Sequence, residues 1–242
     1  MPRSTRGPAL PYRPLAGVVP CGTKWLVAAG RLQGVTLSCA DPELFGSLIE
    51  ILDYRPSFEV IALGCNIGLP TKPGQGGRTC DREARRLLGF SRGGAIFSAP
   101  ARVAIKATTY DDAYRLNDGM GSAAYNILPR IAEVDDAIEP YWQRTVFEVH
   151  PELSFYQLND DVPMHHAKRT HHGQNERRAL LERRMQGVRQ IIDARVRGAR
   201  RHHLFDAAAT LWTARRIAGR VVNRVPEDPE WDDKGLRMEI VR

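Results

Sequence analysis

The chain has 242 residues, of which 43% are hydrophobic and 26% charged, a balance typical of a folded globular protein. No stretch reaches the roughly eighteen apolar residues of a membrane-spanning helix, so we expect no membrane partner. The formal net charge of +7 favours an anionic partner, such as nucleic acid or another phosphorylated anion. A general preference for arginine over lysine would explain the same charge, and both explanations stay open at this point.

The N-terminal residues 1–14 are basic, rich in proline and without the apolar segment of a secretory signal. We therefore expect a flexible basic tail at 1–14 and one domain at 15–242, in a cytoplasmic protein. The four cysteines form no CxxC pair, which argues against a structural zinc site and favours reduced thiols.

Three short apolar runs follow the tail and predict an antiparallel meander of strands, at 15–21, 24–30 and 34–39. Asp41 and Pro42 are suited to a helix N-cap and to the first helical position, so a helix is predicted to begin there. The continuous apolar run Phe58–Leu63 predicts a strand that is buried on both faces.

Residues 66–144 predict a helical insertion, with helices at 81–88, 111–117 and 122–138. A strand is expected at Thr145–Val149, and a helix begins at Pro151. The C-terminal part predicts two more helices and a last strand, at 174–196, 203–218 and 236–241. This order is that of an RNase H-like α/β fold, a mixed sheet flanked by helices with the insertion between the fourth and fifth strands.

Six segments, taken in order, resemble domain-of-unknown-function family 429, whose bacterial and archaeal members are described as predicted RNase H-like nucleases. The segments are GVVPCGTKWLVA (17–28), NIGLP (66–70), RTCDREARRLLG (78–89), AYNILPRIAEVD (124–135), VFEVHPELSF (146–155) and FDAAATLWTARRIA (205–218). The resemblance implies a nuclease that hydrolyses phosphodiesters with two Mg²⁺ or Mn²⁺ ions held by carboxylates.

The resemblance also implies an aspartate in the first strand and another just before NIGLP. Val19 and Gly64 stand at these two positions, and neither side chain can ligate a metal. Because the motifs keep the order of the family, we expect both positions to lie close to Glu148 and Asp206. The two carboxylates that such a centre most needs are therefore replaced.

Glu148 and Asp206 match the remaining acids of the family and are the candidate metal ligands. With Glu152 they are also the candidate catalytic residues, and Asp81 is a further acid that could approach the same face. Each has a structural alternative. Glu148 could pair with an arginine, Glu152 could stabilise the N-terminus of its helix, and Asp206 could belong to a helix start.

The densest basic segment offers candidate nucleic-acid-binding residues, Arg177, Arg178, Arg183 and Arg184. The alternative is a solvated helix face paired with acids, because no aromatic residue is interleaved to stack on bases.

Two functions are consistent with the sequence. The first is a binding or scaffold protein whose two-metal site is impaired. The second is an active metal-dependent nuclease or phosphodiesterase whose carboxylate site has been rebuilt.

Overall fold

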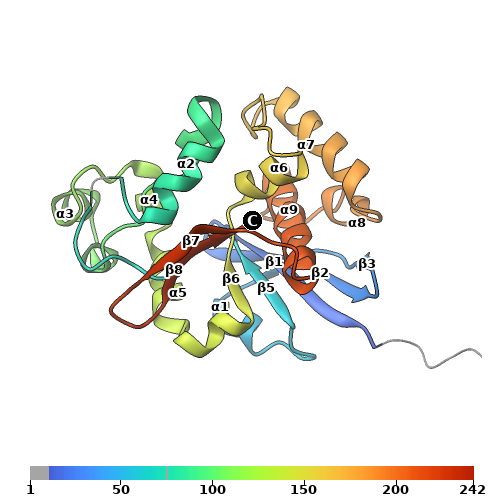
Figure 1. The fold of residues 1–242 in the computed structure, drawn as a ribbon, viewed down its shortest axis with the longest axis horizontal. Coiled ribbons are helices and arrows are strands. Elements are labelled where there is room, and N and C mark those ends of the chain that lie inside the picture. Colours follow the sequence, from blue (N-terminus) through green and yellow to red (C-terminus); the bar gives the residue numbers. More distant parts are fainter. Residues whose placement is uncertain (1–10, 75) are drawn as a thin grey trace, which may run out of the picture.

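The computed structural model describes residues 11–74 and 76–242 and shows an α/β protein built around a mixed sheet (Figure 1). The order of this sheet is β3-β2-β1-β5-β6, with β4 paired to β2. Strand β1 is antiparallel to β2 and parallel to β5, which is in turn parallel to β6. The strands are β1 (Arg13–Cys21), β2 (Lys24–Gln33), β3 (Thr36–Cys39), β4 (Glu43–Phe45), β5 (Val60–Leu63) and β6 (Val146–Glu148).

The expected tail falls mostly on residues 1–10, which lie outside the described part of the chain. Its last two residues, Arg13 and Pro14, already belong to β1, where they are paired with Leu32 and Arg31 of β2. Strand β1 therefore begins two residues before residue 15, where the sequence predicts the domain to start.

The helix predicted at Asp41 begins later. Residues 43–45 instead pair with β2 as strand β4, and helix α1 (Leu48–Leu52) follows. Its N-cap is Ser47, whose hydroxyl accepts a hydrogen bond from the Glu50 backbone N–H. Serine and aspartate are equally good N-caps, so the pairing of β4 with β2 decided between them.

Helices connect β5 to β6, as expected for the insertion. They are α2 (Thr79–Arg92), α3 (Tyr110–Leu116), α4 (Ser122–Asn126) and α5 (Leu128–Ala137), with short 3₁₀ turns η1 (Gly93–Ala95), η2 (Arg102–Lys106) and η3 (Pro140–Arg144). After β6 come α6 (Pro151–Leu158) and the long α9 (Arg201–Ala218). Figure 1 shows α2, α3 and α4 on one side of the molecule and α6, α7 and α9 on the other.

The single helix predicted at 174–196 is two helices, α7 (His171–Arg184) and α8 (Arg189–Ile192). Gly187 separates them with a φ of 76°, a left-handed conformation that an α-helix does not contain. The apolar stripe continues through the break because Met185 and Val188 remain buried in the same core. Side-chain periodicity alone therefore predicted one helix where the backbone makes two.

The last strand, β8 (Arg237–Val241), is close to its predicted position and pairs with β7 (Arg224–Trp231), which was not predicted. Strand β7 contains Pro226 and Pro229 between charged residues, a composition with low β propensity. The two strands form a separate ribbon.

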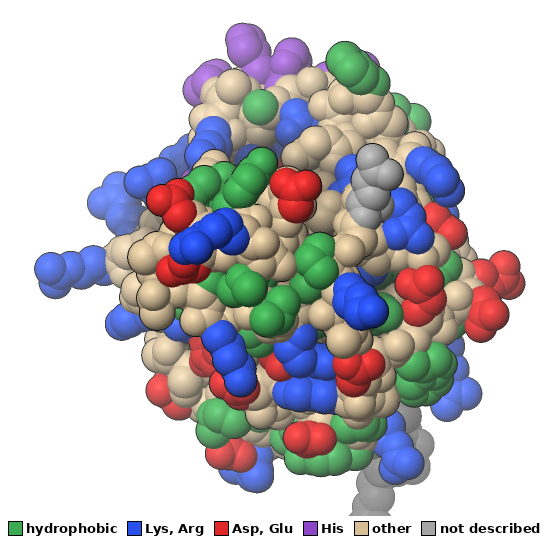
Figure 2. Space-filling model, turned by 90° about the vertical axis from the view of Figure 1, so that its left-hand side faces the viewer, with side chains coloured by type: hydrophobic (Ala, Val, Ile, Leu, Met, Phe, Trp, Pro, Cys, Tyr) green, Lys and Arg blue, Asp and Glu red, His purple; other side chains and the backbone are tan. Residues whose placement is uncertain are grey.

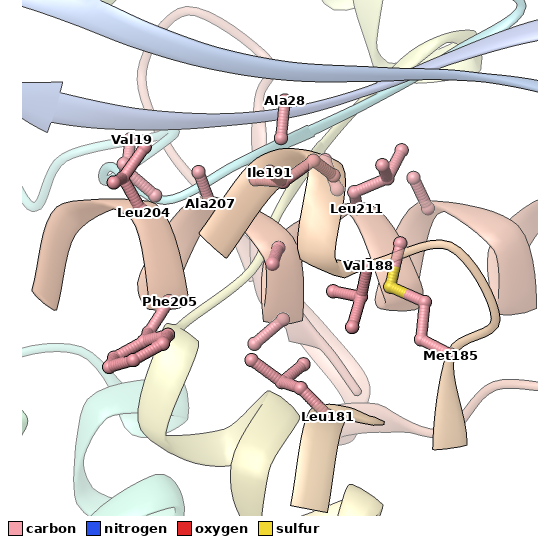
Figure 3. Packing of buried hydrophobic residues seen from close by; sticks show 14 of the residues in the cluster. Val19, Ala28, Leu181, Met185, Val188, Ile191, Leu204, Phe205, Ala207 and Leu211 are labelled. Carbon is pink, nitrogen blue, oxygen red and sulfur yellow. The ribbon is translucent and has the colours of Figure 1, made fainter. Parts of the chain in front are cut away.

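Each face of the main sheet is covered by its own core, because successive side chains of a strand point to opposite faces. Leu15 and Val19 of β1 pack against α9, whereas Ala16 and Val18 pack against α1 and the insertion. Figure 3 shows the first of these cores. Helix α9 lies so close to β1 that a Cβ added to Gly17 would be 2.2 Å from the Leu211 backbone nitrogen. The glycine thus permits the direct contact of helix and strand.

Among the helices of the described residues, none combines the length and the apolar character needed to cross a bilayer. All four cysteines carry free thiols, as expected.

Candidate functional site

A pocket of about 640 Å³ opens at the edge of the sheet where β1, β5 and β6 end. The carboxyl ends of parallel strands meet at one edge, which is where open α/β sheets bind their ligands. Val19 lies near the end of β1, Gly64 follows β5, and both line this pocket together with Asp206 of α9. These three positions, brought together by motif order in the sequence, are therefore neighbours in space.

The two positions without a carboxylate are in direct contact. A Cβ added to Gly64 would lie 3.0 Å from Val19 Cγ1. Val19 is only 3% exposed, and its side chain points toward Leu204 of α9 (Figure 3). An apolar contact thus occupies the place where the resemblance implies two metal-binding aspartates.

Glu148 lies on the opposite face of the sheet from Val19. Within β6, Phe147 packs into the core under α9, whereas Val146 packs into the core under the insertion. Because side chains alternate between the two faces of a strand, Glu148 points to the same face as Val146, toward the insertion. Its backbone is close to the pocket, because Glu148 is paired with Leu63, the neighbour of Gly64. The carboxylate itself does not line the pocket.

The Glu148 carboxylate is bound by Arg78, whose Nη1 and Nη2 donate to it at 2.8 and 2.6 Å. The Ile67 backbone N–H donates a further hydrogen bond of 2.6 Å. Glu148 is 5% and Arg78 2% exposed, so the pair is shielded from water. Of the alternatives that the sequence left open, this geometry is that of a carboxylate paired with an arginine.

Asp81 belongs to the same buried cluster. Arg78 Nη2 donates to its carboxylate at 2.8 Å, and the Ala99 backbone N–H donates at 2.9 Å. Burial alone would raise the pKa of Asp81, but the Arg78 guanidinium and these hydrogen bonds outweigh burial and lower the pKa below its usual value. Asp81 therefore fixes the start of α2 and does not line the pocket.

Glu152 lines the pocket from the first turn of α6. Both of its carboxylate oxygens accept hydrogen bonds from Arg177 Nη2, at 2.7 and 2.9 Å. Arg177 has no exposed surface, and Arg92 Nε lies 3.8 Å from the same carboxylate. Glu152 is thus already neutralised by a buried arginine.

Asp206 lines the pocket from α9 and is 5% exposed. Lys168 Nζ donates to Asp206 Oδ2 at 2.5 Å. The other oxygen, Asp206 Oδ1, is buried and has no hydrogen-bond partner within the described residues. The ammonium group of Lys168 thus takes the place beside Asp206 that a metal ion would need.

The carboxylates do not form a site for Mg²⁺ or Mn²⁺. Within residues 11–74 and 76–242, no three His, Cys, Asp or Glu side chains gather as ligands of one metal ion would. Each candidate acid has its own cation: Arg78 for Glu148, Arg177 for Glu152 and Lys168 for Asp206. Hard divalent cations require several anionic oxygens at one point, and these oxygens are dispersed and neutralised.

Three histidines surround the same pocket, His150, His202 and His203. Burial, followed by the charge of Lys168, lowers the pKa of His150 to about 4, and burial and His203 lower the pKa of His202 to about 4. Burial lowers the pKa of His203 as well. These imidazoles are therefore neutral hydrogen-bonding groups at physiological pH.

The candidate nucleic-acid-binding arginines of α7 fall into two kinds. Arg177 is buried and bound to Glu152, so it cannot reach a phosphate in solution. Arg178 pairs with Glu182 and Asp193, and Arg184 pairs with Asp160. Arg183 is exposed. On the face that carries the insertion, basic and acidic side chains are interspersed (Figure 2).

The sequence interpretation missed the cations that decide the state of the site, chiefly Arg78 and Lys168. Arg78 opens the segment RTCDREARRLLG, and Lys168 stands in the polar loop MHHAKRTHHG. Neither position has a local signal, because arginine is abundant in this chain and pairing depends on the fold. The one feature of the sequence that distinguishes Lys168 is that lysine is much rarer than arginine in this chain.

The chain matches the model of a known protein family. A family model described as "Protein of unknown function (DUF429)" matches residues 17–231. No curated protein and no solved structure matches. The expected family is thereby confirmed, and its description assigns no activity.

Proposed function

We propose that this chain, which belongs to the DUF429 family of proteins of unknown function, is an RNase H-like protein that binds nucleic acid or another phosphorylated anion without hydrolysing it. The sheet order 3-2-1-5-6, in which β2 runs antiparallel to the other described strands of the sheet, supports the RNase H-like assignment. The net charge of +7 supports an anionic ligand.

One observation carries the loss of hydrolysis. Every carboxylate that could serve a two-metal centre is paired with a cation of the chain itself, and Val19 and Gly64 fill the remaining positions. Two-metal catalysis needs free anionic oxygens that hold both ions against the scissile phosphate. Replacing the cations of this site by metal would require breaking the buried Arg78 and Arg177 pairs, which is strongly unfavourable.

The proposal is tested by a nuclease assay on single-stranded DNA, RNA and DNA–RNA hybrids with Mg²⁺ or Mn²⁺. We expect no cleavage above the level measured in EDTA. Asp206→Asn is the control variant, because it keeps the size of the side chain at the pocket. Mn²⁺-dependent cleavage that Asp206→Asn abolishes would establish the alternative, an active nuclease with a rebuilt site.

A further inference from the structure

We propose that the pocket at the sheet edge binds a terminal phosphate, a phosphate monoester carrying one proton, and that Lys168 is its permanent cation in place of a metal. This inference deepens the proposed function and rests on it. The ligand class includes the 5′-phosphate end of a nucleic acid strand and small phosphorylated molecules. Phosphodiesters and sulfate lack the ionisable proton and are excluded.

The walls of the pocket favour an anion. The N-terminal turns of α6 and α9 both line it, through His150 and Glu152 of the first and His202 and His203 of the second. Helix N-termini carry partial positive charge and unpaired N–H groups, which suit phosphate.

Three cationic side chains complete the wall, Arg92, Lys168 and Arg169. The pocket also has two carboxylates, Glu152, which is neutralised by Arg177 behind the wall, and Asp206, which is paired with Lys168, so Arg92 and Arg169 remain as the uncompensated charges. The pocket therefore has an excess of positive charge for a ligand to meet.

His203 adds a hydrogen-bond donor. Its Nδ1 accepts a hydrogen bond from the Arg200 backbone N–H at 3.1 Å, so in the neutral ring the proton is on Nε2. His203 lines the pocket, and this N–H can serve a phosphate oxygen.

Asp206 Oδ1 distinguishes a monoester from other anions. It is a buried carboxylate oxygen for which residues 11–74 and 76–242 supply no hydrogen-bond partner, beside a pocket that is otherwise suited to an anion. Leaving a buried acceptor unpaired is unfavourable, and a hydrogen bond from a ligand hydroxyl removes this penalty. The P–OH group of a singly protonated phosphate monoester is such a donor, whereas a fully ionised anion would be repelled.

Lys168 makes the site independent of metal. Its ammonium group holds Asp206 Oδ2 at 2.5 Å and is partly exposed, with 34% of the side chain accessible. It can therefore keep Asp206 in place and still face a phosphate. EDTA should consequently leave binding unchanged.

Titration calorimetry in EDTA tests the inference, with inorganic phosphate and sulfate as the first pair of probes. We expect phosphate to bind at least about tenfold more tightly than sulfate, the size of one recovered hydrogen bond. Because the second pKa of phosphate monoesters is about 6, affinity for a strand with a 5′-phosphate should fall as pH rises through 6 to 8, whereas inorganic phosphate keeps a P–OH group over this range. Equal binding of the two anions by the natural protein would overturn the proposal.

The second pair of probes is a short single strand with a 5′-phosphate or a 5′-hydroxyl. Tighter binding of the phosphorylated strand than of inorganic phosphate would identify the strand end as the source of the ligand. Equal affinity of the phosphorylated strand and inorganic phosphate would identify small phosphorylated molecules. Equal binding of the two strands would overturn the monoester specificity and leave the proposed function standing.

Two variants assign the effect to the named residues. Asp206→Asn offers an N–H donor beside the pocket, so it should admit sulfate as well as phosphate and lose the discrimination. Lys168→Met should weaken phosphate binding about tenfold or more, whereas Lys168→Arg should retain it. Lys106→Met, which removes an exposed lysine outside the pocket, is the charge-matched control and should change nothing.

Melting curves show whether each variant is folded before its binding is interpreted. If Lys168→Met does not fold, Lys168→Arg and Asp206→Asn still test the cation and the acceptor separately. No binding of either anion or either strand at low salt would overturn both this inference and the proposed anion binding. Hydrolysis of a strand would instead overturn the proposed function.

Discussion

Glu148 and Arg78 form an ion pair that solvent barely reaches, with Asp81 as the second anion on the same guanidinium. Removing one partner of such a pair leaves an uncompensated buried charge, which costs about 3–5 kcal/mol. We therefore expect Glu148→Ala to lower the free energy of unfolding by several kcal/mol in urea denaturation.

Glu59→Ala is the matched control for this prediction. Glu59 pairs with Arg13 at the surface, where its side chain is 44% exposed, and exposed pairs contribute about 0–1 kcal/mol. If Glu148→Ala were as stable as Glu59→Ala, the structural role of Glu148 would be refuted. If Glu148→Ala is this unstable, a loss of activity in that variant would reflect unfolding and not a catalytic role of Glu148.

His150 gives the fold a dependence on pH. Burial and Lys168 lower its pKa from 6.5 to about 4 in the folded protein. Between these values the unfolded chain binds more protons, so stability is lost as pH falls from 6.5 to 4. At about 1.4 kcal/mol per pKa unit, His150 contributes at most about 3 kcal/mol to this loss.

His150→Asn tests this contribution without removing the helix cap. The Nδ1 atom of His150 accepts a hydrogen bond from the Glu152 backbone N–H, and asparagine is a good N-cap that does not titrate. Melting curves from pH 4 to 7 should show a weaker pH dependence than in the natural protein. His165→Asn, at an exposed site, should not alter the dependence; equal curves for all three proteins would contradict the prediction.

At the scale of elements, α7 combines a structural arginine with exposed ones. Arg177 anchors the helix to α6 through Glu152, so Arg177→Ala should cost about 3–5 kcal/mol in unfolding experiments. Arg183→Ala removes an exposed charge and should leave stability nearly unchanged.

Arg183→Ala also tests whether the exposed face of α7 contacts nucleic acid. If Arg183 contacts a phosphate, Arg183→Ala should reduce the slope of log affinity against log salt concentration by about 1. A slope unchanged by Arg183→Ala would assign the basic face of α7 to solvent. The measurement is fluorescence anisotropy of a labelled strand across a salt titration.

Mn²⁺ should not change the thermal stability of the natural protein. A metal that binds only the folded state raises stability by about 2.7 kcal/mol at a hundredfold excess over its Kd. Because Lys168 and the buried arginines hold the carboxylates, we expect no shift in melting temperature with millimolar Mn²⁺. A large shift in the natural protein would favour the active nuclease.

Restoring the two acids should reverse this behaviour. Val19→Asp with Gly64→Asp adds two carboxylates beside Asp206, and their mutual repulsion should destabilise the metal-free protein. Mn²⁺ should then raise the melting temperature of the double variant. Val19→Asn with Gly64→Asn has the same shape without charge, and Mn²⁺ should leave it unchanged.

The order of strands and helices, the insertion, the family and the neighbourhood of Val19, Gly64 and Asp206 could be predicted from the sequence. These features depend on local periodicity and on the order of motifs along the chain. The errors occurred where local signals compete or are absent. Gly187, in a left-handed conformation, separates α7 from α8, which were predicted as one helix. Residues 43–45 form strand β4, so the helix predicted at Asp41 begins later. Strand β7 was not predicted because it contains two prolines.

Only the tertiary structure decided what each candidate acid does. Alternation along β6 turned Glu148 away from the pocket, and packing gave Glu148, Glu152 and Asp206 each a cation far away in sequence. The separations are 70 residues for Arg78 and Glu148, 25 for Glu152 and Arg177, and 38 for Lys168 and Asp206. The sequence by itself determined which carboxylates the site lacks. Long-range packing determined that those remaining are neutralised, because a buried charge must find a partner wherever the fold places one.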